Sequence, residues 1–164
     1  MRPEPDPTGP GQESVWDYPR PPRLEPAVCR IQVVLGGITI ADTTGALRVL
    51  ETSHPPVYYL PPEVIVPGTL TPTARRSFCE FKGWASYMNV TAGDRTEPDA
   101  AWAYASPSPG YEAMAGYVAF YAARMDACYV DGERVQPQPG GFYGGWVTSK
   151  VTGPFKGGPG STFW

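Results

Sequence analysis

His54 is the single histidine of this sequence, and it is the side chain whose unperturbed charge changes near neutral pH. It lies three residues after Glu51 and immediately before Pro55 and Pro56. An imidazole in this position could act as a general base or as a hydrogen-bond donor in a pocket. It could equally fix a proline-rich loop by bonding to the backbone. Glu51 and His54 are therefore candidate ligand-binding residues, and both interpretations of His54 stay open.

A second group of reactive and charged side chains occupies residues 75–82. Cys79 lies three residues before Lys82, and a cation close to a thiol can make it a nucleophile. On one strand, however, these two residues have opposite parity unless a bulge intervenes, and Cys79 could instead be a small buried apolar residue. Arg75 and Arg76 could bind a carboxylate or a phosphate, or they could be solvated and paired with Glu80 or Glu51.

Large aromatic residues of the expected strands alternate with small ones. Among the small residues are Ala85, Ser86, Ala101 and Ala103. Such a pattern can leave an apolar hollow in a sheet, but it can also give a close-packed core. We expect part of the aromatic set to line a pocket, and the candidate ligand-binding residues there are Tyr58, Tyr87, Trp102 and Tyr104.

Composition and charge exclude several classes of protein. Gly 19 and Pro 21 among 164 residues exclude a compact helical bundle, since both residues weaken helix interiors. A net charge of −3 lacks the basic field of a duplex DNA-binding protein. The three cysteines are widely spaced and form no CxxC pair, and there is one histidine, which argues against a tetrahedral Cys/His zinc site. We therefore expect no metal, no cofactor and no duplex nucleic acid as a partner.

The termini and hydropathy indicate a cytoplasmic protein that does not contact a membrane. The first sixteen residues lack the apolar region of a signal peptide. The sequence also contains no run of eighteen apolar residues.

The elements that must position the candidate residues are mainly strands. Residues 31–35 alternate apolar and polar side chains, Gly36-Gly37 is typical of a hairpin turn, and Ile38 and Ile40 resume the alternation. Residues 76–104 read as a three-stranded meander. One short helix is expected near 111–116, ended by Gly116.

Three segments are expected along the chain. Residues 1–14 are a proline-rich, disordered arm. Residues 15–131 form a single β domain that carries a docked N-terminal strip. Residues 132–164 are a Gly/Pro/aromatic extension that packs on the domain. Within the extension Phe155-Lys156-Gly157 repeats Phe81-Lys82-Gly83, but three residues are too few to establish an internal repeat.

Four segments resemble the uncharacterised bacterial family called domain of unknown function 427. They are ALRVLETSHPPVYYLPPE at 46–63, SFCEFKGWASY at 77–87, AWAYASP at 101–107 and AGYVAFYAARMD at 115–126, and the flanks look like the longer members of that family. The resemblance implies a β-tent-like fold in which two antiparallel sheets meet at a steep angle. A nucleotidyltransferase-like label has also been attached to this family. The sequence lacks the Gly-Ser helix start and the closely spaced carboxylates that this chemistry needs to hold Mg²⁺.

These observations predict a domain that binds a small organic or anionic ligand in a partly apolar, aromatic-lined pocket. Whether it catalyses a reaction is left open. One alternative is a protein-interaction or self-association module without catalysis, motivated by the aromatic flanks. Another is nucleotide binding by stacking on aromatic rings. The expected oligomeric state is a monomer or a weak homodimer.

Overall fold

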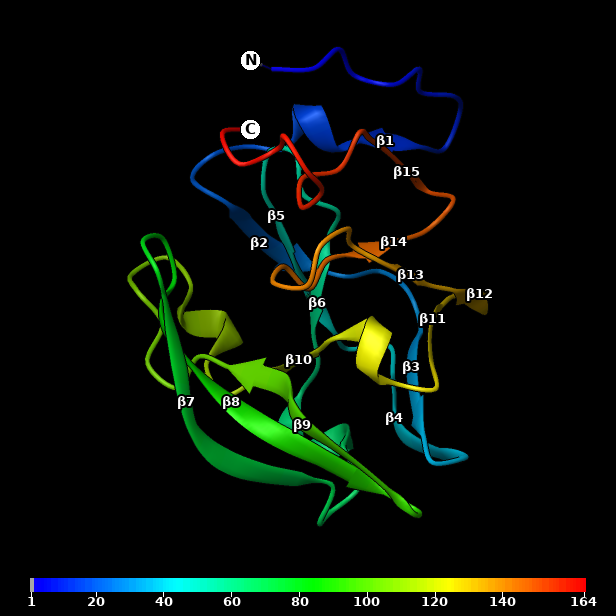
Figure 1. Ribbon diagram of the computed structural model, residues 1–164, viewed down its shortest axis with the longest axis vertical. Coiled ribbons are helices and arrows are strands. Elements are labelled where there is room, and N and C mark those ends of the chain that lie inside the picture. Colours follow the sequence, from blue (N-terminus) through cyan, green and yellow to red (C-terminus); the bar gives the residue numbers. More distant parts are fainter. Residues whose placement is uncertain (1) are drawn as a thin grey trace.

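The computed structural model describes residues 2–164 and consists almost entirely of short strands joined by turns. The prediction of a mainly β chain with antiparallel sheets is confirmed. Two four-stranded antiparallel sheets dominate (Figure 1), with strand orders β10-β9-β8-β7 and β12-β11-β3-β4. The first contains β7 (Leu70–Cys79), β8 (Gly83–Ala92), β9 (Arg95–Ala103) and β10 (Val118–Phe120). The second contains β3 (Ile31–Leu35), β4 (Ile38–Thr43), β11 (Ala127–Val130) and β12 (Glu133–Arg134).

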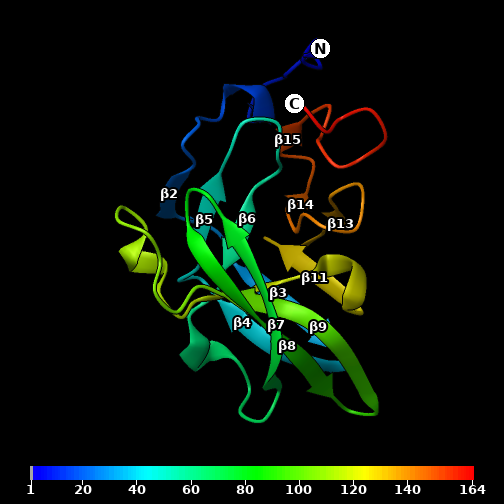
Figure 2. The ribbon, with the colours of Figure 1, turned by 60° about the vertical axis from the view of Figure 1, so that its left-hand side comes forward.

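Three smaller sheets join these two to the ends of the chain. The first has the order β2-β5-β6, with β2 (Arg23–Pro26), β5 (Leu47–Leu50) and β6 (Val57–Tyr59). The second pairs β13 (Gln136–Pro137) with β14 (Trp146–Val147). The third pairs β1 (Glu13–Ser14) in parallel with β15 (Val151–Thr152), so the two ends of the chain lie on the same side of the molecule (Figures 1 and 2).

The hairpin predicted at residues 31–40 is confirmed. Gly36 and Gly37 both have positive φ angles, 60° and 74°, as a two-residue hairpin turn of this type requires. A Cβ atom placed on Gly36 would lie 2.1 Å from the carbonyl oxygen of Ala92. The turn between β3 and β4 therefore touches the turn between β8 and β9, and only glycine fits at this contact between the two large sheets.

The helix expected near 111–116 is a single 3₁₀ turn, Glu112–Met114. Gly110 and Gly116 have φ angles of 97° and 76°, which confine the turn on both sides. The other 3₁₀ helices are Val15–Asp17, Pro62–Val64 and Ala122–Arg124. None of the helices within residues 2–164 has the length and apolar character needed to cross a bilayer.

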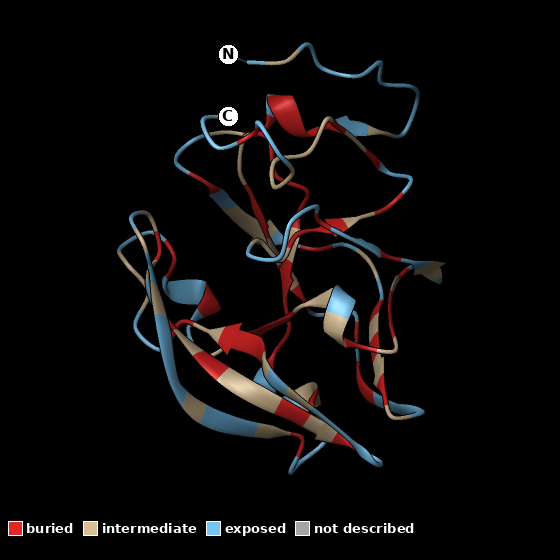
Figure 3. Ribbon diagram, viewed as in Figure 1, coloured by how far each residue is buried: buried red, intermediate tan, exposed pale blue. Residues whose placement is uncertain are grey.

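Buried side chains form three clusters. The main core is mostly aliphatic and includes Ile31, Leu35, Leu60, Phe120 and Trp146. An aromatic cluster contains Tyr59, Tyr87, Trp102, Tyr104 and Tyr111. A terminal cluster joins the ends of the chain through Val15, Trp16, Tyr18, Leu50 and Val151. Figure 3 shows that buried residues run along the inner strands, whereas β7 is largely exposed along one edge.

The C-terminal segment packs into the main core through Val135 and Trp146. Trp146 is 1% exposed, and its indole N–H donates to the carbonyl of Phe120 at 3.0 Å. Truncating a buried aromatic of this size costs about 3–5 kcal/mol. At the other end of the chain, the backbone N–H of Asp6 donates to Gly153 O at 2.8 Å. The disorder expected for the N-terminal arm stays a prediction.

Candidate functional site

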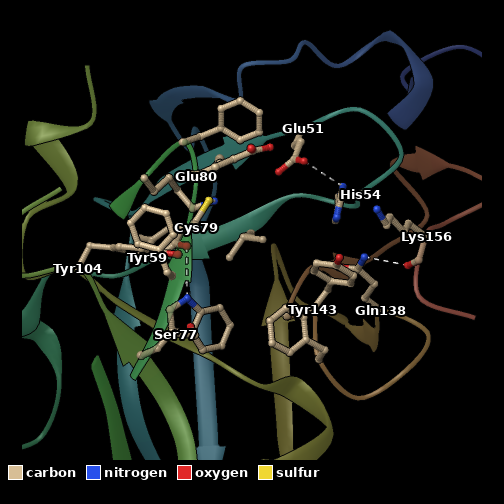
Figure 4. Close-up of a pocket in the computed structure, with 18 of the residues that line it drawn as sticks. Glu51, His54, Tyr59, Ser77, Cys79, Glu80, Tyr104, Gln138, Tyr143 and Lys156 are labelled. Carbon is tan, nitrogen blue, oxygen red and sulfur yellow. Dashed lines mark hydrogen bonds and ion pairs between the residues drawn. The ribbon is translucent and has the colours of Figure 1, made fainter. Parts of the chain in front are cut away.

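A cavity of about 400 Å³ lies between the β5–β6 hairpin, the end of the β7–β8 hairpin, β9 and the C-terminal segment (Figure 4). Its volume falls within the usual range for small-molecule sites. Seven of the nine candidate residues line it, namely Glu51, His54, Cys79, Lys82, Tyr87, Trp102 and Tyr104. Segments that are far apart in the sequence are thus brought together around one space.

Tyr58 and Arg75 do not line this cavity. Successive side chains of a strand point to opposite faces, so Tyr59 lines the cavity while Tyr58 packs on Trp146 in the main core, with ring centroids 5.3 Å apart. The guanidinium of Arg75 lies 4.3 Å from the ring centroid of Tyr87 and lines a separate cavity of about 150 Å³. Sequence alternation alone did not identify which face of each strand meets the cavity.

Lys82 reaches the cavity because β7 ends at Cys79. The chain then turns over three residues and re-enters β8 at Gly83, whose φ is 101°. On one continuous strand, Cys79 and Lys82 would point to opposite faces, but the turn brings them to the same side. The Lys82 ammonium donates to Cys79 Sγ at 3.3 Å. Burial lowers the pKa of Lys82, but the nearby Tyr104 and Cys79 outweigh it, so the pKa lies above its ordinary value. Lys82 is therefore a cation and not an amine nucleophile.

The Lys82 ammonium has no carboxylate partner among residues 2–164. The residue is only 9% exposed, and every ion pair within 4.0 Å in this part of the chain involves arginine or histidine. A buried charge is costly unless it is paired. The cavity therefore presents a cation with no carboxylate of residues 2–164 within 4.0 Å, although Glu51 and Glu80 also line the cavity.

His54 is 6% exposed and is held in one orientation. Its Nδ1 lies 2.9 Å from the carbonyl oxygen of Thr52 and 3.9 Å from Glu51 Oε2. Because a carbonyl only accepts, Nδ1 carries the proton, and Nε2 keeps its lone pair in the neutral ring. Burial lowers the pKa of His54, and this effect exceeds the opposing influence of Glu51. The ring is thus a neutral base at pH 7.

Aromatic rings form the apolar wall. The Trp102 indole N–H donates to the Tyr59 hydroxyl at 3.4 Å, and the hydroxyls of Tyr87 and Ser77 are 2.9 Å apart. Burial raises the pKa values of Tyr59 and Tyr104, so both phenols are neutral. The wall offers flat apolar surface with a few hydroxyl groups, which suits a planar organic ligand.

The C-terminal segment supplies the opposite wall. The residues that it contributes are Gln138, Phe142, Tyr143, Gly144, Lys156 and Trp164. The backbone at Gly144 lies directly against Trp102, because a Cβ there would be 2.1 Å from Trp102 Cη2. Gln138 accepts from Gly145 N at 2.9 Å and donates to Lys156 O at 2.8 Å, which ties the two halves of the segment together.

Two of the cavity's cations were not among the sequence candidates. Arg20 bonds to Glu51 Oε2 at 3.3 Å and to Thr52 O at 3.0 Å. Lys156 lies in the triplet that repeats Phe81-Lys82-Gly83, and both glycines that end these triplets have positive φ. That repetition was the one sequence feature that could have identified Lys156 as a cavity residue, but three residues were too few to interpret. Glu51 pairs with Arg20, and the other charged residues of the lining are Glu80, Lys82 and Lys156.

Within residues 2–164, no three acidic, histidine or cysteine side chains cluster as metal ligands would.

A family model described as a domain of unknown function (DUF427) matches residues 23–131, more than half of the chain. No curated protein matches the sequence. Lys82, His54 and the aromatic wall lie inside the matched segment, whereas Arg20 and the whole opposite wall lie outside it.

Proposed function

This chain belongs to the domain of unknown function 427 family, and on that premise we propose that it binds a small organic anion in the aromatic-lined cavity. The observation that carries the proposal is the Lys82 ammonium, which is 9% exposed, lines the cavity and has no carboxylate partner in the described chain. A carboxylate or phosphate on the ligand would supply the missing counter-ion. The apolar body of the ligand would lie against Tyr87, Trp102 and Tyr104.

The energetics favour an anion over a neutral ligand. A hydrogen bond to a charged group contributes about 1.5–3 kcal/mol, which corresponds to about 10–150-fold in affinity. His54 supports the same site as a neutral base, because its free Nε2 can accept a proton from a ligand hydroxyl or from water.

The test compares aryl carboxylates with their uncharged amides, from benzoate and benzamide to 2-naphthoate and 2-naphthamide. By isothermal titration calorimetry, we expect at least one carboxylate to bind more tightly than its matched amide. Lys82→Met should abolish that preference while preserving the apolar stem. Lys150→Met, which changes an exposed lysine away from the cavity, should keep it. A preference that survives in Lys82→Met, or no preference for any pair, would refute the proposal.

One surface favours a second function, a protein-interaction module. Phe78 and Trp84 are 61% and 53% exposed, their ring centroids are 5.1 Å apart, and Arg76 stacks 5.0 Å over Trp84. Phe78 lies on the outer strand β7, which has a neighbour on one side only, and Trp84 lies opposite it on β8. Exposed paired aromatics are frequent anchors at interfaces. Light scattering of Phe78→Ser/Trp84→Ser against the unmodified chain tests self-association, and identical masses across a concentration series would exclude it.

For the fold, we propose that the two large sheets meet at a steep angle, as the β-tent resemblance implies. The close contact between Gly36 and Ala92 supports a junction of the sheets at their turns. A crystal structure tests this, and sheets stacked face to face with aligned strands would contradict it.

A further inference from the structure

Cys79 and Lys82 form a contact pair in the wall of the cavity. The Lys82 ammonium donates to Cys79 Sγ at 3.3 Å, and both residues line the cavity. Cys79 is a free, half-buried thiol, whereas Lys82 is only 9% exposed. The reactive form of a cysteine is the thiolate, and an ammonium beside the sulfur is placed to balance its charge. The pair therefore brings a nucleophile and a cation together at one point of the cavity.

The two carboxylates of the lining leave this ammonium without an ion pair. Glu51 pairs with Arg20 at 3.3 Å, and Glu80 is exposed. Neither carboxylate lies within 4.0 Å of the Lys82 ammonium. An anionic group that enters the cavity can therefore pair with Lys82 directly beside the thiol.

His54 is an independent sign that the cavity accommodates a ligand. The ring is 6% exposed, its Nδ1 is bonded to Thr52 O, and its Nε2 has no hydrogen-bond partner among residues 2–164. In this range, Ser53 Oγ is the only side-chain nitrogen or oxygen that is both fully enclosed and unpartnered. His54 Nε2 must therefore open onto accessible space, and His54 lines the cavity opposite Cys79 (Figure 4). A polar atom in this position takes its partner from whatever fills the cavity.

The short distance between the ammonium and the sulfur determines where a bound acid would react. A carboxylate accepts from an ammonium at about 2.7–2.9 Å. The carbon next to that carboxylate can then lie about 3–3.5 Å from the sulfur, which is the separation of reacting atoms just before a bond forms. This geometry depends only on the 3.3 Å contact between Lys82 and Cys79. The aromatic wall is available for the rest of the molecule.

We infer that Cys79 is a nucleophile for a carboxylic acid whose carbon next to the carboxylate is electrophilic. The carboxylate pairs with Lys82, and the Cys79 thiolate, which has lost its proton to water, attacks that carbon. The S–C bond forms as the bond from that carbon to the leaving group breaks, and the leaving group departs with the electron pair of the broken bond. The inference rests on the proposed function, because it assumes that Lys82 binds the anionic group.

Alkylation by iodoacetate and by its uncharged analogue iodoacetamide tests the inference. Both reagents add a two-carbon group to sulfur and release iodide, and they differ in the charge next to the reacting carbon. Peptide mass spectrometry measures both rates at Cys79, and 2-mercaptoethanol gives the ratio of the two rates for an ordinary thiol. Relative to that ratio, we expect Cys79 to favour iodoacetate by about tenfold or more.

Substitutions assign this preference to the Lys82 ammonium. Lys82→Met and Lys82→Gln should each lower the rate ratio at Cys79 to that of 2-mercaptoethanol, and Lys150→Met should leave it unchanged. Cys29 is an internal control, because it is a half-buried free thiol that does not line the cavity. The rate ratio at Cys29 should be the same in every variant, and thermal unfolding verifies that each variant is folded.

The outcomes separate this inference from the proposed function. If carboxylates bind through Lys82 in calorimetry but Cys79 does not favour iodoacetate, the nucleophile is refuted and the proposed function stands. If the preference for iodoacetate persists in both Lys82 variants, the ammonium is not its cause, and the inference is equally refuted. If no carboxylate is preferred over its amide and Cys79 shows no preference, both ideas fail. A preference that disappears with the Lys82 ammonium supports the inference.

Discussion

Substituting alanine at Gly144 should undock the C-terminal wall of the cavity. The new Cβ would lie 2.1 Å from Trp102 Cη2, so one partner must move by about 1.5 Å to reach ordinary contact. Trp102 is 7% exposed and packed by other rings, with the Tyr121 centroid 4.6 Å away, so its ring cannot retreat. Overpacking of this kind costs about 1–3 kcal/mol. For a chain of this size, the melting temperature should fall by about 2–12 °C.

Thermal unfolding followed by circular dichroism measures this effect, and Gly141→Ala is the matched control. Gly141 lies in the same loop and is exposed, its φ lies outside the left-handed region, and a Cβ placed on it would meet no atom within 4 Å. Its alanine variant should unfold within about 0.5 kcal/mol of the unmodified chain. Equal melting temperatures for the two variants would show that the loop does not pack on Trp102, and the wall described above would be wrong.

Burial holds the pKa of His54 below 6.5, so an NMR titration of the single imidazole should give a midpoint below that value. Because the unfolded chain then takes up the proton first, the free energy of unfolding should fall as pH drops through 6.5, and a midpoint above 6.5 would contradict this. The hydrogen-bonded Arg48 guanidinium holds the pKa of Glu13 below 4.5, so the pair stabilises the fold above pH 4.5 and loses that contribution as pH falls through the lowered value. Urea unfolding of Arg48→Met should therefore depend less on pH in that window, and an unchanged pH dependence would exclude the pairing. The Ser53 hydroxyl is buried without a hydrogen-bond partner among residues 2–164, so Ser53→Ala should leave urea stability unchanged or raise it by up to about 1 kcal/mol. A loss above about 1 kcal/mol would show that the hydroxyl does have a partner. Burial raises the pKa of Cys128 to about 12, so a thiol reagent at pH 8 should leave it unmodified until urea is added, and rapid native labelling would contradict its burial.

Local sequence signals predicted the strands well. The Gly36-Gly37 pair specified the β3–β4 hairpin, because both residues must adopt positive φ. These features depend on a few neighbouring residues, so the sequence contains all the information that they need.

From the sequence, only the wall of the cavity formed by residues 51–104 could be predicted. Residues 51–54, 79–82 and 102–104 drew attention through residue type, and the fold brings them to one cavity. Whether Tyr58 or Tyr59 faces that cavity depends on which side of β6 packs on Trp146, and this is a long-range contact. The opposite wall depends on how residues 138–157 fold back, where close approaches such as Gly144 to Trp102 decide the path. No local pattern encodes these distances.

Two parts of the chain form the walls of the cavity. Binding of a ligand in the cavity and docking of the C-terminal extension would therefore favour each other. Lys82 and the aromatic wall belong to the family segment, and Gln138 and Tyr143 belong to the extension, so a ligand that contacts both walls would link them noncovalently. By thermodynamic linkage, the free energy by which the docked extension strengthens ligand binding equals the free energy by which the bound ligand stabilises the docked extension. Amide exchange at residues 138–157 would therefore slow in proportion to ligand concentration, and the extension would report the level of that small molecule to any protease or partner that competes for it.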